Sequence, residues 1–368
     1  MNFVKCLGCV MLPLALWAQR EREVPPMRID EYNPKSTLKV PEHPTTRAKF
    51  PLIDVHNHQN RTLEGGGLGL DKLVSEMDAL NMRIMVNLSG GFGERLAQTV
   101  KGMNKSHPGR FVVFANIDFR GMNDPGYPDK IANQLEADIK AGAQGLKFFK
   151  NLGMDLKDES GKRVPVDDPR LDKALEICGK YNVPILIHTA EPRPFFDPID
   201  KNNERWLELN QFPSRARPAD KYPSWDQLMN EQMNMFAKHP KVKFINAHMG
   251  WLAGELDELG RRLDKHPNMY VEIGAILAEL GRQPRYAREW FTKYQDRVLF
   301  GKDIYEPSEY HVYFRVLETN DEYFDYYRKR HAFWKMYGMN LPDDVLKKLY
   351  YKNALKLIPG LDASKFPK

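Results

Sequence analysis

The chain has 368 residues, of which 42% are hydrophobic and 28% are charged. This length exceeds the roughly 100–200 residues of a typical domain, although some single-domain α/β folds commonly reach about 250 residues or more. The composition excludes a largely disordered chain. The formal net charge of +6 comes without a dense basic tract or a nucleic-acid motif, so we expect no nucleic-acid partner.

The first 18 residues have the pattern of a cleavable signal peptide. Lys5 gives a short basic region, residues 10–17 are apolar, and Ala18 is a small residue suited to cleavage. The apolar run is shorter than the roughly 20 residues of a membrane-spanning helix, so we expect no membrane partner. The alternative is a buried N-terminal helix. We predict an exported chain, periplasmic or secreted, in which Cys178 is the one cysteine kept and no internal disulfide forms.

Residues 19–49 are rich in charge and proline and show no apolar period. Such a composition favours an extended segment over a helix or a strand. We interpret these residues as an extended arm that leads to the domain predicted for residues 50–360 and packs on its surface.

Beyond residue 50, short apolar runs alternate with amphipathic stretches. Each run has the length of a strand and is rich in Val, Ile or Phe. The eight predicted strands are 51–58, 84–89, 111–118, 145–150, 184–190, 243–248, 270–275 and 298–303. The predicted helices are 70–80, 169–181, 225–238, 252–263 and a closing amphipathic helix at 343–358. Asp167 or Asp168 can cap the second of these helices, and Ser224 can cap the third.

Eight strand-then-helix units in series predict a parallel sheet. With eight strands, closure into a (β/α)8 TIM barrel is the arrangement we expect, as a single domain with inserted loops at its C-terminal face. A doubly wound open sheet is the alternative. The glycines at 65–67 follow the first strand but lack the spacing of a dinucleotide-binding turn.

Two segments are too long for a minimal barrel. Residues 191–223 follow the fifth strand and hold many Pro, Arg and aromatic residues, and residues 305–341 follow the eighth strand and are dense in Tyr, Phe and Trp. Both come after strand C-terminal ends, where barrel enzymes build their active sites. We expect both to form walls or a lid. The alternative role is a subunit contact in a homodimer, because aromatic loops also serve interfaces.

The strongest chemical signal is the pair His56 and His58. Two histidines at i and i+2 on a strand point to the same face, so both imidazoles can reach one cation, and neutral imidazole suits Zn, Fe, Ni or Cu. His188, His248 and Asp303 also lie at the ends of predicted strands. Their shared placement at the catalytic face predicts one metal site there.

These residues belong to a set of short motifs found together. The motifs are Asp54-x-His56-x-His58, Ile187-His188-Thr189, Ala247-His248-Met249-Gly250, Phe300-Gly301-x-Asp303 and Tyr351-x-Asn353-Ala354-Leu355-x-Leu357. In this set the chain resembles the amidohydrolase superfamily, in particular its amidohydrolase-related (amidohydrolase 2) branch of TIM-barrel hydrolases, lactonases and carboxy-lyases. The resemblance covers about residues 51–358.

The resemblance implies a role for each matched residue. His56, His58 and His188 would be metal ligands, and Asp303 would both touch the metal and move a proton. His248 would stay off the metal and polarise the substrate or water. We expect one divalent metal ion, with Zn as the favoured element. The alternative is a binuclear centre bridged by a carboxylated Lys147.

On the mononuclear hypothesis, Lys147 contacts a substrate anion or pairs with a carboxylate, a role for which Lys150 competes. Glu191 and Arg193 in the first long segment are the other predicted substrate-binding residues, because arginine can grip a carboxylate with two hydrogen bonds. Arg205, Arg215 and Arg217 lie in the same segment, and the direction of Glu272 is left open because strand parity does not settle it.

The predicted function is hydrolysis of an ester, lactone or amide bond in a small anionic substrate by metal-activated water. The alternative is non-oxidative decarboxylation by a carboxy-lyase with the same metal site, and the fold cannot separate the two. The predicted export favours hydrolysis. A non-catalytic binding protein is a third hypothesis, disfavoured because both Asp303 and His248 are present.

Overall fold

The structure is a computed structural model that describes residues 25–29, 31–59, 69–331 and 334–367. The chain forms two compact units, Met1–Thr37 and Leu38–Lys368. The described part of the first unit contains neither helix nor strand, and the predicted signal peptide at residues 1–18 lies outside the described residues. Within the described ranges, no helix combines the length and the apolar character needed to cross a membrane.

The second unit begins with the last part of the predicted arm. Residues 38–49 contain no helix or strand. Ala48 is buried, the backbone N–H of Lys49 donates to Glu318, and the ring Nδ1 of His43 lies 2.6 Å from Asp321. The end of the arm is therefore held against the segment that follows the eighth strand.

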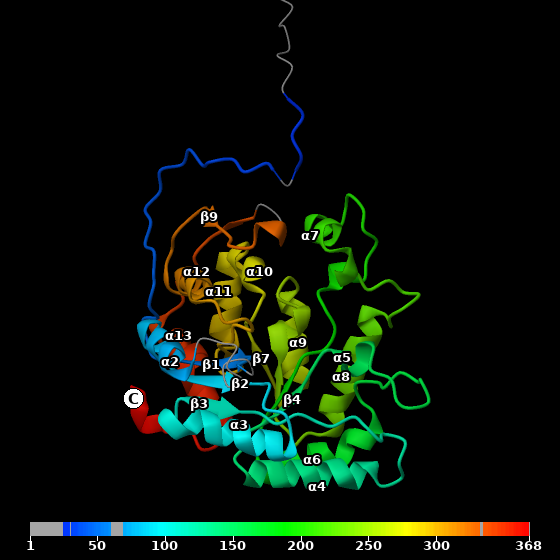
Figure 1. Ribbon diagram of the computed structural model, residues 1–368. Coiled ribbons are helices and arrows are strands. Elements are labelled where there is room, and N and C mark those ends of the chain that lie inside the picture. The colour runs from blue at the N-terminus through cyan, green and yellow to red at the C-terminus, as the bar shows by residue number, and fades with distance from the viewer. Residues whose placement is uncertain (1–24, 30, 60–68, 332–333, 368) are drawn as a thin grey trace, which may run out of the picture. The chain divides into compact units, whose positions relative to one another are not determined.

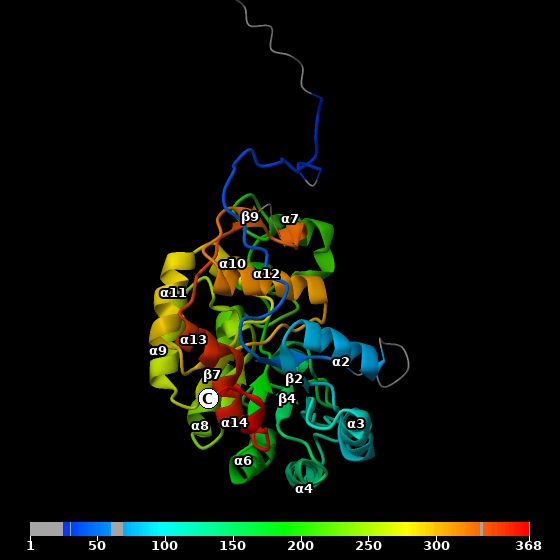
Figure 2. The ribbon, with the colours of Figure 1, turned by 90° about the vertical axis from the view of Figure 1, so that its left-hand side faces the viewer.

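In the described part of the second unit, eight short parallel strands occupy the centre. They are β1 (Leu52–Asn57), β2 (Met82–Asn87), β3 (Phe111–Val113), β4 (Leu146–Phe148), β5 (Ile185–Ile187), β6 (Phe244–Asn246), β7 (Met269–Glu272) and β8 (Val298–Leu299). Nearly all of their residues are buried, as expected for strands covered on both faces. Figures 1 and 2 show the helices of this unit around the strands.

The strands pair in sequence order, in two sheets: β1-β2-β3 and β4-β5-β6-β7-β8. A parallel bridge between Ala115 and Leu146 links the two sheets at one junction. At the other junction Val55 N–H donates to Phe300 O at 3.0 Å and Asp303 N–H donates to His56 O at 2.7 Å. The order is the one predicted for a (β/α)8 arrangement, although the ladders do not form one continuous closed sheet.

Apart from α7 (Trp206–Gln211), which belongs to the long segment after β5, the α-helices between the strands in the described ranges are α2 (Leu70–Ala79), α3 (Gly93–Ser106), α4 (Tyr127–Lys140), α5 (Asn151–Met154), α6 (Asp172–Tyr181), α8 (Trp225–Lys238), α9 (Leu256–Lys265), α10 (Leu277–Gly281) and α11 (Pro284–Lys293). The prediction for α8 is confirmed, and the Ser224 hydroxyl caps it by accepting from Gln227 N–H at 3.1 Å. The closing helix consists of α13 (Asp343–Lys347) and α14 (Asn353–Leu357), joined by a π-helical turn at Lys348–Lys352.

Several predicted boundaries are wrong. The strand predicted for 111–118 ends at Val113, because the Asn116 side chain donates to Leu88 O and accepts from Gly91 N–H where a ladder would continue. The helix predicted for 252–263 begins only at Leu256, because a left-handed turn precedes it. The helix predicted for 169–181 opens with a 3-10 turn at Pro169–Leu171, capped by Asp168.

The two long segments contain their own short elements. The segment after β5 holds α7 (Trp206–Gln211), and the segment after β8 holds α12 (Pro307–Glu318) and an antiparallel pair, β9 (Phe324–Asp325) with β10 (Lys335–Met336). In Figure 1 α7 and β9 lie at the same end of the unit. The buried carboxylate of Glu208 binds Arg205 and Arg215 within the first segment and lies 3.3 Å from Nε2 of His331 in the second.

Candidate metal centre and active site

The structure brings the five predicted centre residues together beyond the C-terminal ends of four strands. Asp303 Oδ1 lies 3.4 Å from Nε2 of His56 and 3.6 Å from Nε2 of His58. The ring of His248 lies 5.0 Å from that of His56 and 4.4 Å from that of His188, between ring centroids. Parallel strands of such a fold end at one face, so residues distant in sequence meet there.

Three residues of this cluster, His56, His58 and Asp303, could hold one divalent cation, and His188 lies outside this group. One ligand atom from each of His56, His58 and Asp303 can be chosen so that all three lie within 4.8 Å of one another. The Nε2 atoms of His56 and His188 are buried and have no hydrogen-bond partner among the described residues. A buried ring nitrogen without a partner is costly, and coordination removes that cost. The set of neutral imidazoles and one carboxylate suits Zn or another transition metal.

Electrostatics keeps these groups in the protonation states that a cation requires. Burial lowers the pKa of His56 and His188 well below the ordinary value, and burial lowers the pKa of His58 to about 4. Burial alone would raise the pKa of Asp303, but the neighbouring histidines and Lys147 hold it at about 2. The imidazoles are therefore neutral and the carboxylate is ionised at neutral pH, as ligands must be.

Glu272, at the end of β7, is the most important residue that the sequence did not assign. Its Oε1 lies 2.9 Å from Nδ1 of His56 and accepts from the backbone N–H of His248 at 2.6 Å. A carboxylate on Nδ1 fixes the tautomer of His56 and leaves the Nε2 lone pair for a cation. A Cβ at Gly301 would meet Glu272 Oε2 at 2.2 Å, so the glycine of the Phe300-Gly301 motif makes room for this carboxylate.

His248 lies in an unusual backbone turn. Residues 248–251 all have left-handed conformations, with φ values of 58° at His248 and 52° at Met249. Such conformations cost energy for residues other than glycine and persist where the surroundings enforce them, often at functional sites. A Cβ at Gly250 would lie 2.6 Å from the Asn246 amide, which explains that glycine. The sequence pattern gives no signal for such a turn, and it sets the direction of both His248 and Trp251.

The hydrogen bonds of His248 differ from the role that the resemblance implies. Its Nδ1 lies 2.8 Å from the carbonyl of Gly274, and a carbonyl can only accept, so Nδ1 carries a proton. In the neutral ring, Nε2 is then an acceptor, and it lies 3.3 Å from Nδ1 of His188. When Nδ1 of His188 carries the proton, the buried Nε2 of His188 is free for a cation. His248 thus orients His188 and can donate to a substrate oxygen only when protonated.

Asp54 ties two of the strand ends together. Its Oδ1 accepts from the backbone N–H of His56 at 3.0 Å and of Lys302 at 3.1 Å, and its Oδ2 accepts from the Tyr310 hydroxyl at 2.6 Å. Burial raises the pKa of Asp54 to about 6. The motif Asp54-x-His56-x-His58 therefore supplies a residue of the cluster, His56. It also supplies the Asp54 carboxylate, which holds the backbone of His56 against the loop that carries Asp303.

Lys147, on β4, is buried at the same centre. Its side chain is 1% exposed, and among the described residues its Nζ has no hydrogen-bond partner. Burial lowers its pKa to about 8, against the opposing effects of Asp303 and Glu272. Lys147 therefore does not reach solvent from the end of its strand. Lys150 instead lies 2.5 Å from Glu191 and is partly exposed.

The other predicted substrate-binding residues are engaged within the protein. Glu191 is buried and bound by Lys150 and by Arg217, at 3.1 Å. Arg193 is exposed, lies 3.7 Å from both Asp226 and Glu255, and covers the Trp225 ring at 5.1 Å. Arg205 and Arg215 bind Glu208. Each arginine predicted to grip an anion therefore already has a carboxylate partner.

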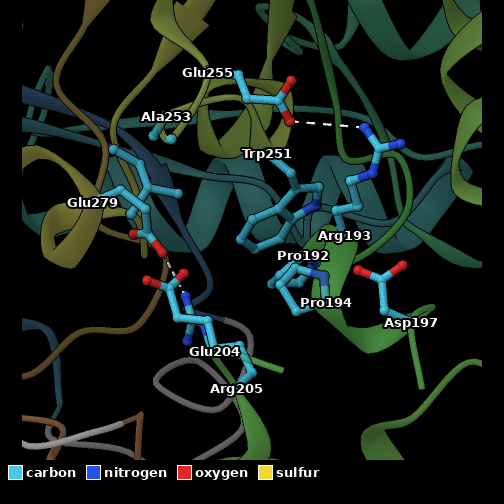
Figure 3. Close-up of a pocket in the computed structure, with 12 residues that line it drawn as sticks. Pro192, Arg193, Pro194, Asp197, Glu204, Arg205, Trp251, Ala253, Glu255 and Glu279 are labelled. Carbon is cyan, nitrogen blue, oxygen red and sulfur yellow. Dashed lines mark hydrogen bonds and ion pairs between the residues drawn. The ribbon is translucent and has the colours of Figure 1, made fainter. Parts of the chain in front are cut away.

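A cavity of about 240 Å³ adjoins the cluster (Figure 3). Trp251 connects the two, because its indole stacks on the His248 ring with centroids 4.4 Å apart and also lines the cavity. The remaining lining comes from the segment after β5 and from the loops after β6 and β7. It consists of Pro192, Arg193, Pro194, Asp197, Glu204, Arg205, Ala253, Gly254, Glu255, Ile276 and Glu279.

Comparisons with known proteins agree with this geometry. The family described as Amidohydrolase matches residues 53–360. A TIM-barrel protein from Bordetella bronchiseptica is 15% identical with a TM-score of 0.50, over 83% of this chain and 97% of that one. A dihydroxybenzoic acid decarboxylase from Polaromonas sp. JS666, solved with manganese and 2-nitroresorcinol, is 14% identical with a TM-score of 0.52, over 84% of this chain and 96% of that one.

A 4-oxalomesaconate hydratase from Rhodopseudomonas palustris is 14% identical with a TM-score of 0.50, over 85% of this chain and 97% of that one. The search of curated proteins gave no match. At these identities the solved structures show the fold and leave the reaction open. The family is one of metal-dependent enzymes that act on small molecules, and the match covers most of the chain and all five cluster residues. The chain belongs to the amidohydrolase family.

Proposed function

We propose that the chain is a metal-dependent hydrolase that cleaves an ester, lactone or amide bond of a small substrate. The observation that carries this proposal is the ionised Asp303 carboxylate between two neutral imidazoles, with the cation of Lys147 buried beside them. Hydrolysis requires a base and a hydrogen-bond donor that stabilises negative charge on the substrate, both beside one cation site.

His56, His58, His188 and Asp303 are the residues that would hold the cation, which we expect to be Zn or a similar ion. A bound divalent cation lowers the pKa of water from 15.7 to about 7. Asp303 accepts a proton from the attacking water and returns it to the leaving group. Lys147 Nζ, which has no hydrogen-bond partner among the described residues, donates to a negative oxygen on the substrate, either present at the start or formed during attack.

Decarboxylation is the second candidate. The similar fold of the dihydroxybenzoic acid decarboxylase favours it, as does Lys147, which could bind a substrate carboxylate. The cavity beside Trp251 argues against an acidic substrate, because its lining holds four carboxylates and only two guanidinium groups, and it argues equally against the anionic substrate predicted for the hydrolase. We rank hydrolysis first for this reason.

The test is product analysis in ¹⁸O-labelled water with metal-loaded protein. A panel of esters, lactones and amides should give one labelled oxygen in the carboxylate product, and Asp303→Asn should lower kcat by about 10²–10⁴-fold while retaining the fold. Release of CO₂ from hydroxybenzoates, with no hydrolysis in the panel, would overturn the proposal in favour of a carboxy-lyase.

We also propose, from the N-terminal pattern, that the chain is exported. Mass spectrometry of exported protein should then show a start near Gln19, and an intact Met1 form there would refute it. The homodimer contact predicted for the aromatic segments stays a prediction, which light scattering of the purified chain decides.

A further inference from the structure

Two residues that line the cavity beside Trp251 carry buried polar atoms without a hydrogen-bond partner among the described residues. The indole Nε1 of Trp251 is buried and has no hydrogen-bond partner among the described residues, and the same holds for Oε2 of Glu279. Buried polar atoms are nearly always satisfied, so each such atom calls for an explanation. One is a donor and the other is an acceptor, and both belong to residues that line a single cavity.

The acceptor is held firmly in place. Oε1 of Glu279 accepts from Arg205 Nη2 at 2.6 Å, and Arg205 is itself bound to Glu208 and covers the Trp334 ring at 5.2 Å. Figure 3 shows the Glu279–Arg205 pair on one side of the Trp251 indole and Arg193 with Glu255 on the other. A fixed carboxylate with one free oxygen is suited to accept from a ligand.

The charge and shape of the lining restrict the ligand class. The cavity carries a formal charge of −2, from the guanidinium groups of Arg193 and Arg205 against four carboxylates, and it therefore disfavours an anion. Pro192, Ile276 and the indole face of Trp251 add apolar surface. A ligand that fits must be neutral, must donate and accept hydrogen bonds, and must present an apolar face.

We propose that this cavity binds a neutral, polyhydroxylated part of the substrate, such as a sugar ring. A hydroxyl group can donate to Glu279 Oε2, and another can accept from Trp251 Nε1. The C–H face of the ring packs on the indole, which excludes water. This inference rests on the proposed function, because Trp251, which lines the cavity, also stacks on His248 of the candidate reaction centre.

The test measures binding of methyl β-D-glucopyranoside to the full chain, loaded with Zn and after chelation, by ligand-observed saturation-transfer NMR and tryptophan fluorescence. Trp251→Phe removes the indole N–H and keeps an aromatic face, and Glu279→Gln replaces the free acceptor oxygen. Trp290→Phe is the matched control, since its Nε1 is also buried without a partner among the described residues but its ring packs on Phe291 and Tyr294, away from the cavity.

We expect the glycoside to bind with or without metal, and each cavity variant to weaken binding about tenfold while the control leaves it unchanged. Circular dichroism and the thermal midpoint identify any variant that does not fold. Absence of glycoside binding, unchanged binding in both cavity variants, or tighter binding of glucuronate would overturn the proposal. Because the readout needs no turnover, glycoside binding that persists beside a failed hydrolase assay would refute the proposed reaction alone.

Discussion

The carboxylate of Glu272 lies 2.9 Å from Nδ1 of His56, while Nε2 of the same ring faces Asp303 at 3.4 Å. One imidazole is thus fixed at one nitrogen and left free at the other. Hydrogen-bond partners of this kind orient metal ligands and raise their basicity. Ser89 has the same relation to His58, with its hydroxyl 2.8 Å from Nδ1.

Glu272→Gln should weaken metal binding by about 10–100-fold, because an amide fixes the required tautomer of His56 less strictly than a carboxylate and carries no charge. Competition with a chromophoric chelator measures this affinity. Glu231→Gln is the control, since Glu231 pairs with Arg163 at 2.5 Å and touches none of the cluster residues. Equal metal affinity in the Glu272 variant would mean that the carboxylate has no role in ligation.

Lys147→Met should make the protein more stable and less active. The lysine pKa falls from an ordinary 10.5 to about 8 through burial, which corresponds to about 3 kcal/mol of unfavourable free energy for the charged form. Replacing a buried, unpaired ammonium by an apolar side chain of similar length removes that cost. Thermal unfolding and kcat are the two measurements. Lys150→Met, which only breaks a partly exposed pair, should change neither by much. A loss of stability in the Lys147 variant would show that the ammonium has a partner.

Glu208→Gln should cost about 3 kcal/mol of folding free energy at pH 7. Burial alone would raise the pKa of Glu208, but His331, Arg205 and Arg215 hold it at about 2, below its ordinary 4.5. A carboxyl group with a lowered folded-state pKa stabilises the fold above pH 4.5 and loses this contribution as the pH falls towards 2. Denaturant unfolding should therefore show that the difference in unfolding free energy between the unchanged protein and the Glu208→Gln variant shrinks as the pH falls from 7 to 2.5. Glu204→Gln, at an exposed pair with Arg282, should lose less than about 1 kcal/mol at any pH.

Cys178 should be inert in the folded protein. Its side chain is fully buried in α6, and burial raises the pKa of the thiol above its ordinary value, so little thiolate forms and none is accessible. A colorimetric thiol reagent should react with it only after denaturation. Rapid reaction under native conditions would mean that α6 opens locally.

The sequence predicted those features that follow from local patterns. Eight apolar runs gave the eight strands, and Ser224 placed the start of α8 correctly because a capping side chain acts within a few residues. His56 and His58 could be paired because alternation along a strand is a local rule. All of these depend on neighbours in the chain.

The remaining features depend on residues far apart. The direction of Glu272 could not be chosen because it lies at the end of β7, and its partner His56 is 216 residues away. The left-handed turn at 248–251 is opposed by the intrinsic preference of three of its four residues, so only tertiary packing explains it. Arg205 likewise binds Glu279, 74 residues further along the chain, a contact that no local pattern reveals.

The contact of Glu208 with Arg205, Arg215 and His331 has a consequence for chimaeric proteins. Loops at the C-terminal face of such a fold are often treated as exchangeable modules. Here the segment after β5 carries Glu208 together with both arginines, so a graft of this segment keeps its buried charges paired, and only the His331 ring comes from the segment after β8. A graft of the segment after β5 should therefore fold more readily than a graft of the segment after β8, which would bury the His331 ring without its acceptor.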